Sequence, residues 1–183
     1  MGKQGVVVWL TGLSGSGKTT VAQALAEVLI RAGHSAHVLD GDRLRTGLNS
    51  DLGFSPEDRA ENIRRAGEVA ALFADAGVIA IAAFISPYRA GRDAARRAAG
   101  AQHFFEVFLD TPIEECERRD PKGLYRRARA GDLLDFTGVS APYESPLDPD
   151  VHIMTCSVEE TVDRICRLLA DRGVIEVCVP PCH

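Results

Sequence analysis

Short blocks of consecutive hydrophobic residues alternate along this chain with segments of helical periodicity. An uninterrupted apolar block of four to eight residues is typical of a parallel strand that is covered on both faces. The pattern therefore predicts five strands, over residues 6–10, 36–39, 78–85, 104–109 and 151–154.

Helical spacing between these blocks predicts the connecting elements. The first helix begins near Thr20 and stops at Gly33, and Ser55 followed by Pro56 is a strong start for another. The remaining pattern predicts helices over 87–99, from 112 until Pro121, and over 158–169, with a short helix and a loop between 43 and 54. Alternating strands and helices indicate an α/β fold with a doubly wound, mainly parallel sheet, whose ligands bind at the carboxyl ends of the strands.

Composition places the chain among ordinary single-domain proteins and limits its partners. The 183 residues carry a net charge of −5, which argues against a nucleic-acid-binding surface. No apolar run has membrane-spanning length and no signal peptide precedes residue 6, so we expect a cytoplasmic protein without membrane contacts. The five cysteines favour free thiols. The spacing of Cys178, Cys182 and His183 fits no common zinc pattern, and we expect a loose tail over 174–183.

A glycine-rich segment between the first strand and the first helix carries the clearest motif. The sequence Gly-Leu-Ser-Gly-Ser-Gly-Lys-Thr over 12–19 (the phosphate loop) has the Walker A spacing, in which backbone N–H groups surround phosphate oxygens. Lys18 would neutralise the transferred phosphate and Thr19 would bind Mg²⁺. The alternative is a glycine-rich turn that matches by chance, and the strand before and the helix after disfavour it.

Two aspartates follow the second strand and face the phosphate loop in the predicted fold. In extended geometry Asp40 and Asp42 would share one face, where one could hold a magnesium-bound water and the other could accept the proton of an attacking hydroxyl. Asp-Gly-Asp is also a good turn sequence, so a solvated turn is the alternative.

Basic residues gather in two further places. Arg59 and Asn62 are three residues apart on one predicted helix face, and with Arg45 they could hold an anion, although arginines on a helix are more often solvated. The basic run over 118–129 leads into a segment, 121–149, that is poor in apolar periodicity. We expect a lid that closes over phosphates, with a solvated basic loop as the alternative.

Together these blocks resemble the adenylylsulfate kinase family. The resemblance covers about residues 6–169 and includes Gly47-Leu48-Asn49, 52–55, 58–59, 61–65, 84–87, 119–125 and 136–138, beside the phosphate loop and 40–42. It implies transfer of the γ-phosphate of ATP to the 3′-hydroxyl of adenosine 5′-phosphosulfate (adenylyl sulfate), with Mg²⁺. It also suggests a homodimer, and it leaves open whether the chain works alone or is associated or fused with ATP sulfurylase.

The resemblance assigns residues to two sites. ATP would be held by Gly12 and 15–20, that is Gly15, Ser16, Gly17, Lys18, Thr19 and Thr20, with Arg118 and Cys156 near its adenine. Adenylyl sulfate would be held by Asp42, Arg45, Phe54, Arg59, Asn62, Ile85, Ser86, Lys122 and Phe136. Phe54 and Phe136 would stack on its adenine. Ser86 matches a family phosphoserine position, and we expect it to bind substrate because direct in-line transfer needs no covalent intermediate.

The sequence also departs from the family pattern. Arg43 stands where Asn is usual, Arg126-Arg127 replaces Lys-Lys, and Asp135 is an acid beside a polyanion site. Two alternatives remain open at this point: a kinase for another small molecule such as gluconate or a nucleoside, and a nucleotide-sensing domain without catalysis. A sensor would not need the complete phosphate loop and both aspartates.

Overall fold

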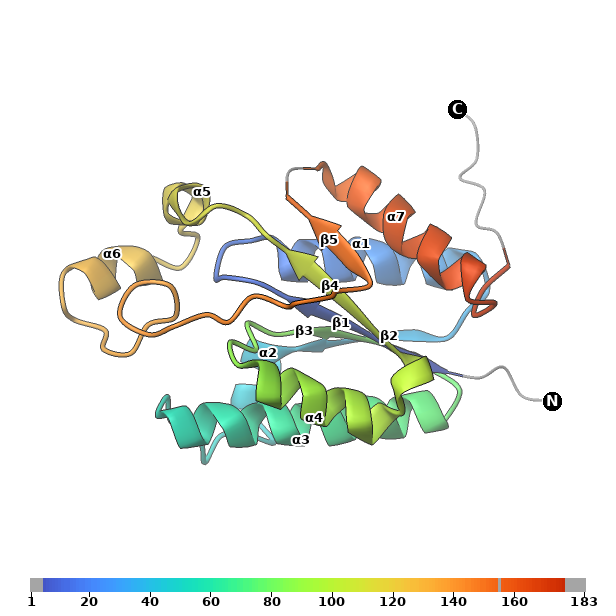
Figure 1. The fold of residues 1–183 in the computed structure, drawn as a ribbon, viewed down its shortest axis with the longest axis horizontal. Helices are drawn as coiled ribbons and strands as arrows, with labels where there is room; N and C mark the ends of the chain where they lie inside the picture. Colours follow the sequence, from blue (N-terminus) through green and yellow to red (C-terminus); the bar gives the residue numbers. More distant parts are fainter. Residues whose placement is uncertain (1–4, 155, 177–183) are drawn as a thin grey trace.

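Five parallel strands form the sheet at the centre of the computed structural model, which describes residues 5–154 and 156–176 (Figure 1). The strand order is β2-β3-β1-β4-β5, and every pairing is parallel. This confirms the predicted fold class. The strands are β1 (Val6–Thr11), β2 (Ala36–Asp40), β3 (Ile79–Ala83), β4 (Phe104–Leu109) and β5 (Val151–Ile153).

Helices cover both faces of the sheet, as Figure 1 shows. On one face, α1 (Lys18–Arg31) and α7 (Val158–Asp171) enclose a core that includes Leu25 and Ile165. On the other face, α3 (Pro56–Asp75) and α4 (Arg89–Ala99) pack over Trp9. The shorter elements are α2 (Gly41–Arg45), a 3₁₀ turn (Ala101–His103), α5 (Ile113–Arg119) and α6 (Leu124–Arg129).

Most element boundaries agree with the sequence pattern, and the differences have local causes. The Ser55 hydroxyl accepts the Asp58 N–H and Pro56 opens α3, as predicted. The strand predicted over 78–85 was too long. Strand β3 ends at Ala83, and the chain then turns through Ser86, whose φ is +41°. Helix α1 begins at Lys18, two residues earlier than predicted, because its first turn closes the phosphate loop.

The segment over 121–149 contains more structure than its sequence pattern indicated. It forms α6, and Tyr125 and Phe136 join Cys116 in a small buried cluster beside the phosphate loop. Thr137 and Ala141 form an isolated β-bridge. At the start of the tail that was expected to be loose, over 174–183, Ile175 is buried in the core and Val174 packs against it. Cys178, Cys182 and His183 lie outside the described residues.

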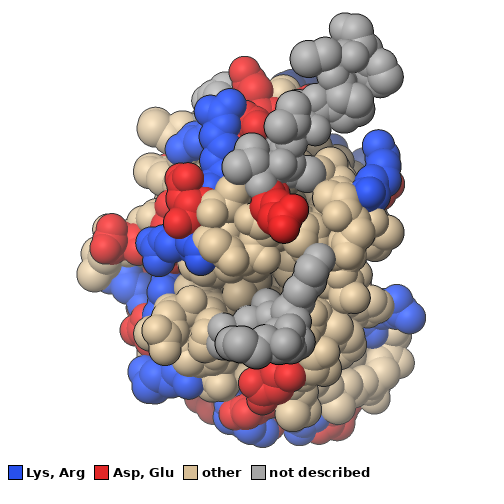
Figure 2. All heavy atoms as spheres, turned by 90° about the vertical axis from the view of Figure 1, so that its right-hand side faces the viewer, with Lys and Arg blue, Asp and Glu red and all other residues tan. Residues whose placement is uncertain are grey.

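Figure 2 views the end of the molecule opposite the carboxyl ends of the strands. Lys and Arg side chains lie among Asp and Glu side chains on this face, so neither sign of charge dominates it. No described helix is long and apolar enough to span a membrane.

Candidate active site

The phosphate loop joins the carboxyl end of β1 to the first turn of α1. Its glycines adopt positive φ values of +149° at Gly12, +77° at Gly15 and +97° at Gly17, which L side chains rarely adopt. A Cβ at Gly12 would lie 2.5 Å from the Leu109 carbonyl oxygen. The loop therefore has its shape for two reasons, backbone conformation and contact with β4.

Lys18 is buried at the centre of the loop. Its ammonium group donates to the carbonyl oxygens of Gly12 (2.9 Å) and Leu13 (2.6 Å) and lies 3.3 Å from the Ser16 hydroxyl. Burial lowers its pKa from 10.5 to about 8, and the nearby charge of Lys122 acts in the same direction. An anion placed in the loop would reverse this shift, because it favours the charged form.

The two aspartates lie beside the loop but not in the arrangement that the sequence suggested. Asp40 ends β2 and caps α2: its Oδ1 accepts the N–H groups of Asp42 (3.0 Å) and Arg43 (3.3 Å). Asp42 is therefore helical, and the expectation that both carboxylates share one face of an extended strand was wrong. The helical conformation is favoured over the extended one because Asp is a strong N-cap residue, so its hydrogen bonds to these N–H groups stabilise the start of α2. The Thr19 hydroxyl donates to Asp40 Oδ2 at 2.9 Å.

Lys122 brings the segment over 121–149 to the same place. Its ammonium forms an ion pair with the Asp42 carboxylate, and both side chains are exposed. Tyr125 in α6 donates its hydroxyl to the Ser14 carbonyl oxygen at 2.9 Å. The segment thus contacts both the phosphate loop and the second aspartate.

Two arginines and an aromatic ring form the next part of the site. The Arg45 guanidinium lies 4.4 Å from the centre of the Phe54 ring, and that of Arg59 lies 5.8 Å from it. Partial burial lowers the pKa of Arg45, and the charge of Arg59 adds to this effect. Two guanidinium groups that repel each other favour an anionic ligand between or beside them.

Arg59 also connects the two predicted stacking residues. It donates to the carbonyl oxygens of Phe54 and Asp135 and to the Thr137 hydroxyl, so it joins the loop before α3 to the loop that carries Phe136. Asp135 has a φ of +54°, and its carbonyl oxygen contacts Arg59.

The two aromatic rings have different environments. Phe54 is 57% exposed, whereas Phe136 is 6% exposed and packs edge-on against Tyr125 with ring centres 5.0 Å apart. Phe54 is therefore open to solvent, although the Arg45 guanidinium lies over its ring. Phe136 supports the cluster beside the phosphate loop in this conformation.

Ser86 has a buried hydroxyl whose hydrogen bonds are taken by the protein. Its Oγ accepts from the indole of Trp9 (3.1 Å) and donates to the Thr11 hydroxyl (2.9 Å), and the residue is 1% exposed. The Thr11 hydroxyl in turn donates to the Ile85 carbonyl oxygen at 2.8 Å. This geometry disfavours a covalent role for Ser86 and leaves Ile85, which is partly exposed, as the part of the turn that faces outward.

The remaining predicted residues lie at the edges of the site. Thr20 and Cys156 are exposed, and Arg118 is an exposed residue of α5 that pairs with Glu115 at 2.7 Å. Asn62 is buried on α3 and accepts a hydrogen bond from Asn49 at 3.0 Å.

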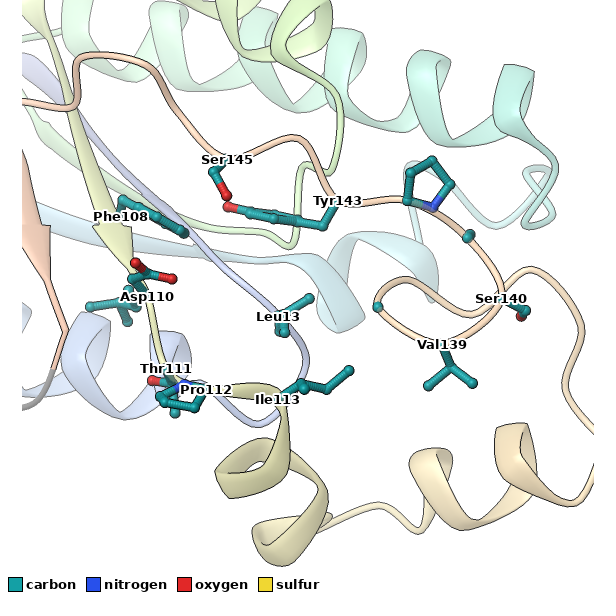
Figure 3. A pocket seen from close by; sticks show the side chains of 14 residues that line it. Leu13, Phe108, Asp110, Thr111, Pro112, Ile113, Val139, Ser140, Tyr143 and Ser145 are labelled. Carbon is teal, nitrogen blue, oxygen red and sulfur yellow. The ribbon is translucent and has the colours of Figure 1, made fainter.

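A cavity of about 540 Å³ lies beside the phosphate loop, where Leu13 and Asp110 line it, whereas Asp40 and Asp42 do not. Figure 3 shows Leu13, Phe108 and Tyr143 around it, between β4 and the segment over 138–145. The Tyr143 hydroxyl lies 2.8 Å from that of Thr11, so one wall of the cavity is connected to the Ser86 network.

Sequence reasoning missed a buried ion pair that supports this region. Arg92 of α4 is 2% exposed and contacts Glu106 of β4 at 2.7 Å, and it also donates to the carbonyl oxygens of Ser86 and Glu144, both at 2.7 Å. An arginine in an arginine-rich helix is usually solvated. The available signal was Glu106, a single acid inside a buried strand.

Comparisons with known proteins agree with one another. The sequence matches the family model described as adenylylsulphate kinase over residues 4–154. The adenylyl-sulfate kinase of Enterobacter sp. (strain 638) is 60% identical over 152 residues, which are 83% of this chain and 76% of that protein. The structure of Mycobacterium tuberculosis APS kinase in complex with AMPPNP and APS has a TM-score of 0.88 and 50% identity, over 91% of this chain and 98% of that one. A hexameric APS kinase from Thiobacillus denitrificans is 34% identical with a TM-score of 0.73, over 96% of this chain and 30% of its own.

Proposed function

The chain belongs to the adenylylsulphate kinase family, and we propose that Lys18, Asp40 and Asp42 carry the chemistry of its reaction. That reaction transfers the γ-phosphate of ATP to the 3′-hydroxyl of adenosine 5′-phosphosulfate and gives 3′-phosphoadenylyl sulfate and ADP. It belongs to sulfate assimilation.

These residues have different roles in the proposal. Lys18 places a cation among the carbonyl oxygens of the phosphate loop, where it binds the transferred phosphate as negative charge develops. Asp42 accepts the proton of the attacking 3′-hydroxyl, because its exposed carboxylate lies at the start of α2 beside the loop. Asp40 holds the start of α2 and the Thr19 hydroxyl in place.

Oxygen ligands suited to Mg²⁺ are present at this point. The Thr19 hydroxyl and the Asp40 carboxylate are hard donors 2.9 Å apart, and Mg²⁺ prefers such oxygens together with substrate phosphates and water. Among the described residues no three His, Cys, Asp or Glu side chains form a metal cluster, which fits an ion held partly by its nucleotide. The Thr19 hydroxyl, with the Asp40 carboxylate acting through a water, would hold the ion, and Mg²⁺ bound there would supply positive charge that offsets the charge of the phosphates.

Adenylyl sulfate occupies the region around Arg45, Phe54 and Arg59 in the proposal. The single observation that carries this assignment is the presence of two guanidinium groups within 5.8 Å of the exposed Phe54 ring, which together offer charge for an anion and an aromatic surface for adenine. Asn62, Ile85, Ser86, Lys122 and Phe136 complete that site. Gly12, Gly15, Ser16, Gly17, Thr20, Arg118 and Cys156 complete the ATP site.

A coupled assay of ADP release tests the proposed function. The purified protein should release ADP with ATP, Mg²⁺ and adenylyl sulfate, and it should release no more than background with gluconate or a nucleoside. Turnover of gluconate without turnover of adenylyl sulfate would overturn the assignment.

The segment over 121–149 acts as a lid in this proposal. Lys122, Tyr125 and the Asp135 carbonyl oxygen contact three separate parts of the site, so opening the segment would release all of them together. Trypsin should cut at Arg126 and Arg127 in the free protein and should cut far more slowly when ADP and adenylyl sulfate are bound. Equal cleavage rates would identify a passive loop.

The assembly and location of the chain remain separate proposals. The resemblance suggests a homodimer and leaves an association with ATP sulfurylase open, and the cytoplasm is the location expected from the sequence. One relative, the APS kinase of Thiobacillus denitrificans, is hexameric. Sedimentation of the purified protein at micromolar concentration tests the homodimer, because a monomeric sedimentation coefficient would exclude it. Co-purification with the sulfurylase of the same cell tests the association.

A further inference from the structure

Asn49 is a fully buried polar residue in the turn between α2 and α3. Its side-chain nitrogen donates to Asn62 Oδ1 at 3.0 Å, and its backbone N–H donates to the Leu44 carbonyl oxygen at 2.9 Å. The other side-chain atom, Oδ1, is enclosed and has no hydrogen-bond partner among the described residues. An unpaired buried polar atom costs free energy, so its presence calls for an explanation.

The direction of the Asn49–Asn62 hydrogen bond follows from that unpaired atom. Turning both amides over would keep one hydrogen bond between them, with Asn62 as the donor. It would also place the NH₂ group of Asn49, with two donors, where its oxygen now lies. Unpaired buried donors are rarer than under-satisfied carbonyl oxygens. The observed direction, with Asn49 as donor, is therefore the favoured one.

This direction decides which group Asn62 offers to the site. Because its oxygen is used by Asn49, its NH₂ group remains, and that group donates to no residue that the structure describes. Asn62 lies three residues after Arg59, on the same face of α3. That face contacts the loop of Asp135 and Thr137 through Arg59.

The turn that carries Asn49 is fixed to α3 by an arginine. Arg65 donates to the Leu48 carbonyl oxygen at 3.1 Å and to both carboxylate oxygens of Asp51, at 2.7 and 2.9 Å. Glu61 completes the charged group on this side, because it accepts from Arg65 at 2.8 Å. Asn49 therefore cannot move away from Asn62 without breaking these ion pairs.

We propose that Asn49 is a positioning residue that fixes the polarity of Asn62, so that Asn62 presents an N–H donor to an acceptor atom of the substrate. The acceptor class is a phosphate, sulfate or ribose oxygen or a ring nitrogen. The proposal rests on the proposed function for its placement of Asn62 at adenylyl sulfate. It also accounts for the unpaired oxygen of Asn49: the amide orientation that lets the Asn49 NH₂ group donate to Asn62 turns the Asn49 oxygen to a place without a donor.

Asn49→Asp tests the proposal because it changes polarity with almost no change in shape. A carboxylate at position 49 can only accept, so the Asn62 amide turns over and its oxygen faces the anionic substrate. The dissociation constant of adenylyl sulfate, measured by calorimetry on the ADP-loaded protein at pH 8, should rise about tenfold to a hundredfold. The dissociation constant of ADP should stay within twofold of the parent.

The pH profile of the same variant separates polarity from a general structural defect. When the introduced carboxyl group is protonated, its O–H can donate to Asn62 as the parent amide does, so the deficit relative to the parent should shrink as the pH falls from 8 to 6. Asp51 and Glu61 stay ion-paired with Arg65 over this range, and their hydrogen bonds to arginine side chains keep their pKa values low. Dividing the dissociation constant of the variant by that of the parent at each pH cancels the effect of groups that titrate in both proteins. A deficit that does not depend on pH would overturn the proposal.

Asn49→Leu is the matched control, since it removes the hydrogen bond without reversing it. It should weaken adenylyl sulfate binding about threefold to tenfold and leave ADP binding unchanged, and it decides the question if Asn49→Asp does not fold. Unchanged adenylyl sulfate binding in both variants, or equal loss of both ligands, would overturn the proposal. Absence of adenylyl sulfate binding in the parent would instead contradict the proposed function itself.

Discussion

The phosphate loop and the region around Arg45, Phe54 and Arg59 that we propose to bind adenylyl sulfate (the adenylyl sulfate region) lie at the same end of the sheet but are built in different ways. The loop is a run of consecutive residues, 12–19, whose shape depends on glycine conformation and on backbone contacts with β4. The adenylyl sulfate region joins α2, α3 and the segment over 121–149 through long side chains, above all Arg59 and Lys122. The first is shaped mainly by residues that are neighbours in the chain, whereas the second depends on contacts between residues that lie far apart in the chain.

This difference separates two functions. A preformed loop of backbone N–H groups suits phosphate, which every nucleoside triphosphate carries. A region assembled from separate elements can require a particular acceptor before it closes, because binding must hold those elements together. We therefore expect changes in the loop to reduce turnover itself and changes in the adenylyl sulfate region to reduce mainly the affinity for one substrate.

Among the variants considered, Lys18→Ala should cause the largest loss of turnover. A small loss would contradict the assignment of catalysis to the phosphate loop. Removing the buried ammonium eliminates charge stabilisation in the transition state, and kcat should fall by about a thousandfold. The coupled ADP assay measures this loss, with circular dichroism as the check that the variant is folded. A rate within a few-fold of the parent would exclude catalysis through this loop.

Asp42→Asn should have the next largest effect. The amide keeps the size of the side chain but cannot accept the proton of the 3′-hydroxyl, so kcat should fall by about a hundredfold. The variant also loses the ion pair with Lys122, and Lys122→Met serves as its control because it removes that pair and keeps the carboxylate. Because Lys122 also belongs to the proposed adenylyl sulfate site, Lys122→Met should mainly raise the KM for adenylyl sulfate and keep most of kcat. A kcat for Lys122→Met well above that of Asp42→Asn at saturating adenylyl sulfate supports proton transfer by Asp42, and equal losses of kcat would contradict it.

The sequence was sufficient for the sheet and the phosphate loop, because these depend on local spacing. The residues around the loop were assigned from a family resemblance, and their roles stay predictions. Continuous apolar runs predicted every strand, and Gly12 to Thr19 identified the loop without any tertiary contact. It was not sufficient for Asp42, since the choice between an extended turn and helix α2 depends on hydrogen bonds to the Asp40 side chain. Asn49 and Arg92 were missed because their importance lies in burial, which spacing does not reveal.

Within the adenylyl sulfate region, Phe54→Ala and Phe136→Ala separate a ring that only contacts the ligand from a ring that also supports the fold. Loss of a stacking ring should weaken adenylyl sulfate binding about tenfold in both variants, measured by calorimetry on the ADP-loaded protein. Only Phe136→Ala should also lower the free energy of unfolding, by about 3 kcal/mol, because this ring is buried against Tyr125 while Phe54 is exposed. Loss of ADP and adenylyl sulfate affinity in equal measure in Phe136→Ala would show that the ring supports the phosphate loop and does not stack on adenine.

The smallest predicted effect concerns the protonation of Lys18. Burial lowers its pKa to about 8 in the ligand-free protein, and bound phosphate should raise it again, so ADP binding takes up a proton when the pH is above 8. Only the protonated form binds well, and its fraction falls as the pH rises through the pKa. The dissociation constant of ADP should therefore be about threefold higher at pH 8.5 than at pH 7.5. Calorimetry in buffers with different ionisation enthalpies measures the proton uptake directly.

Lys18→Met provides the control for this pH dependence. Its affinity for ADP should be lower at every pH and should not change between pH 7.5 and 8.5, because the neighbouring Cys116 thiol has a pKa that burial raises above its usual range. Persistence of the parent's pH dependence in Lys18→Met would assign the titration to another group. A parent affinity that stays constant up to pH 9 would mean that the carbonyl oxygens of Gly12 and Leu13 compensate for the burial of the ammonium, so that the loop holds its charge before any phosphate arrives.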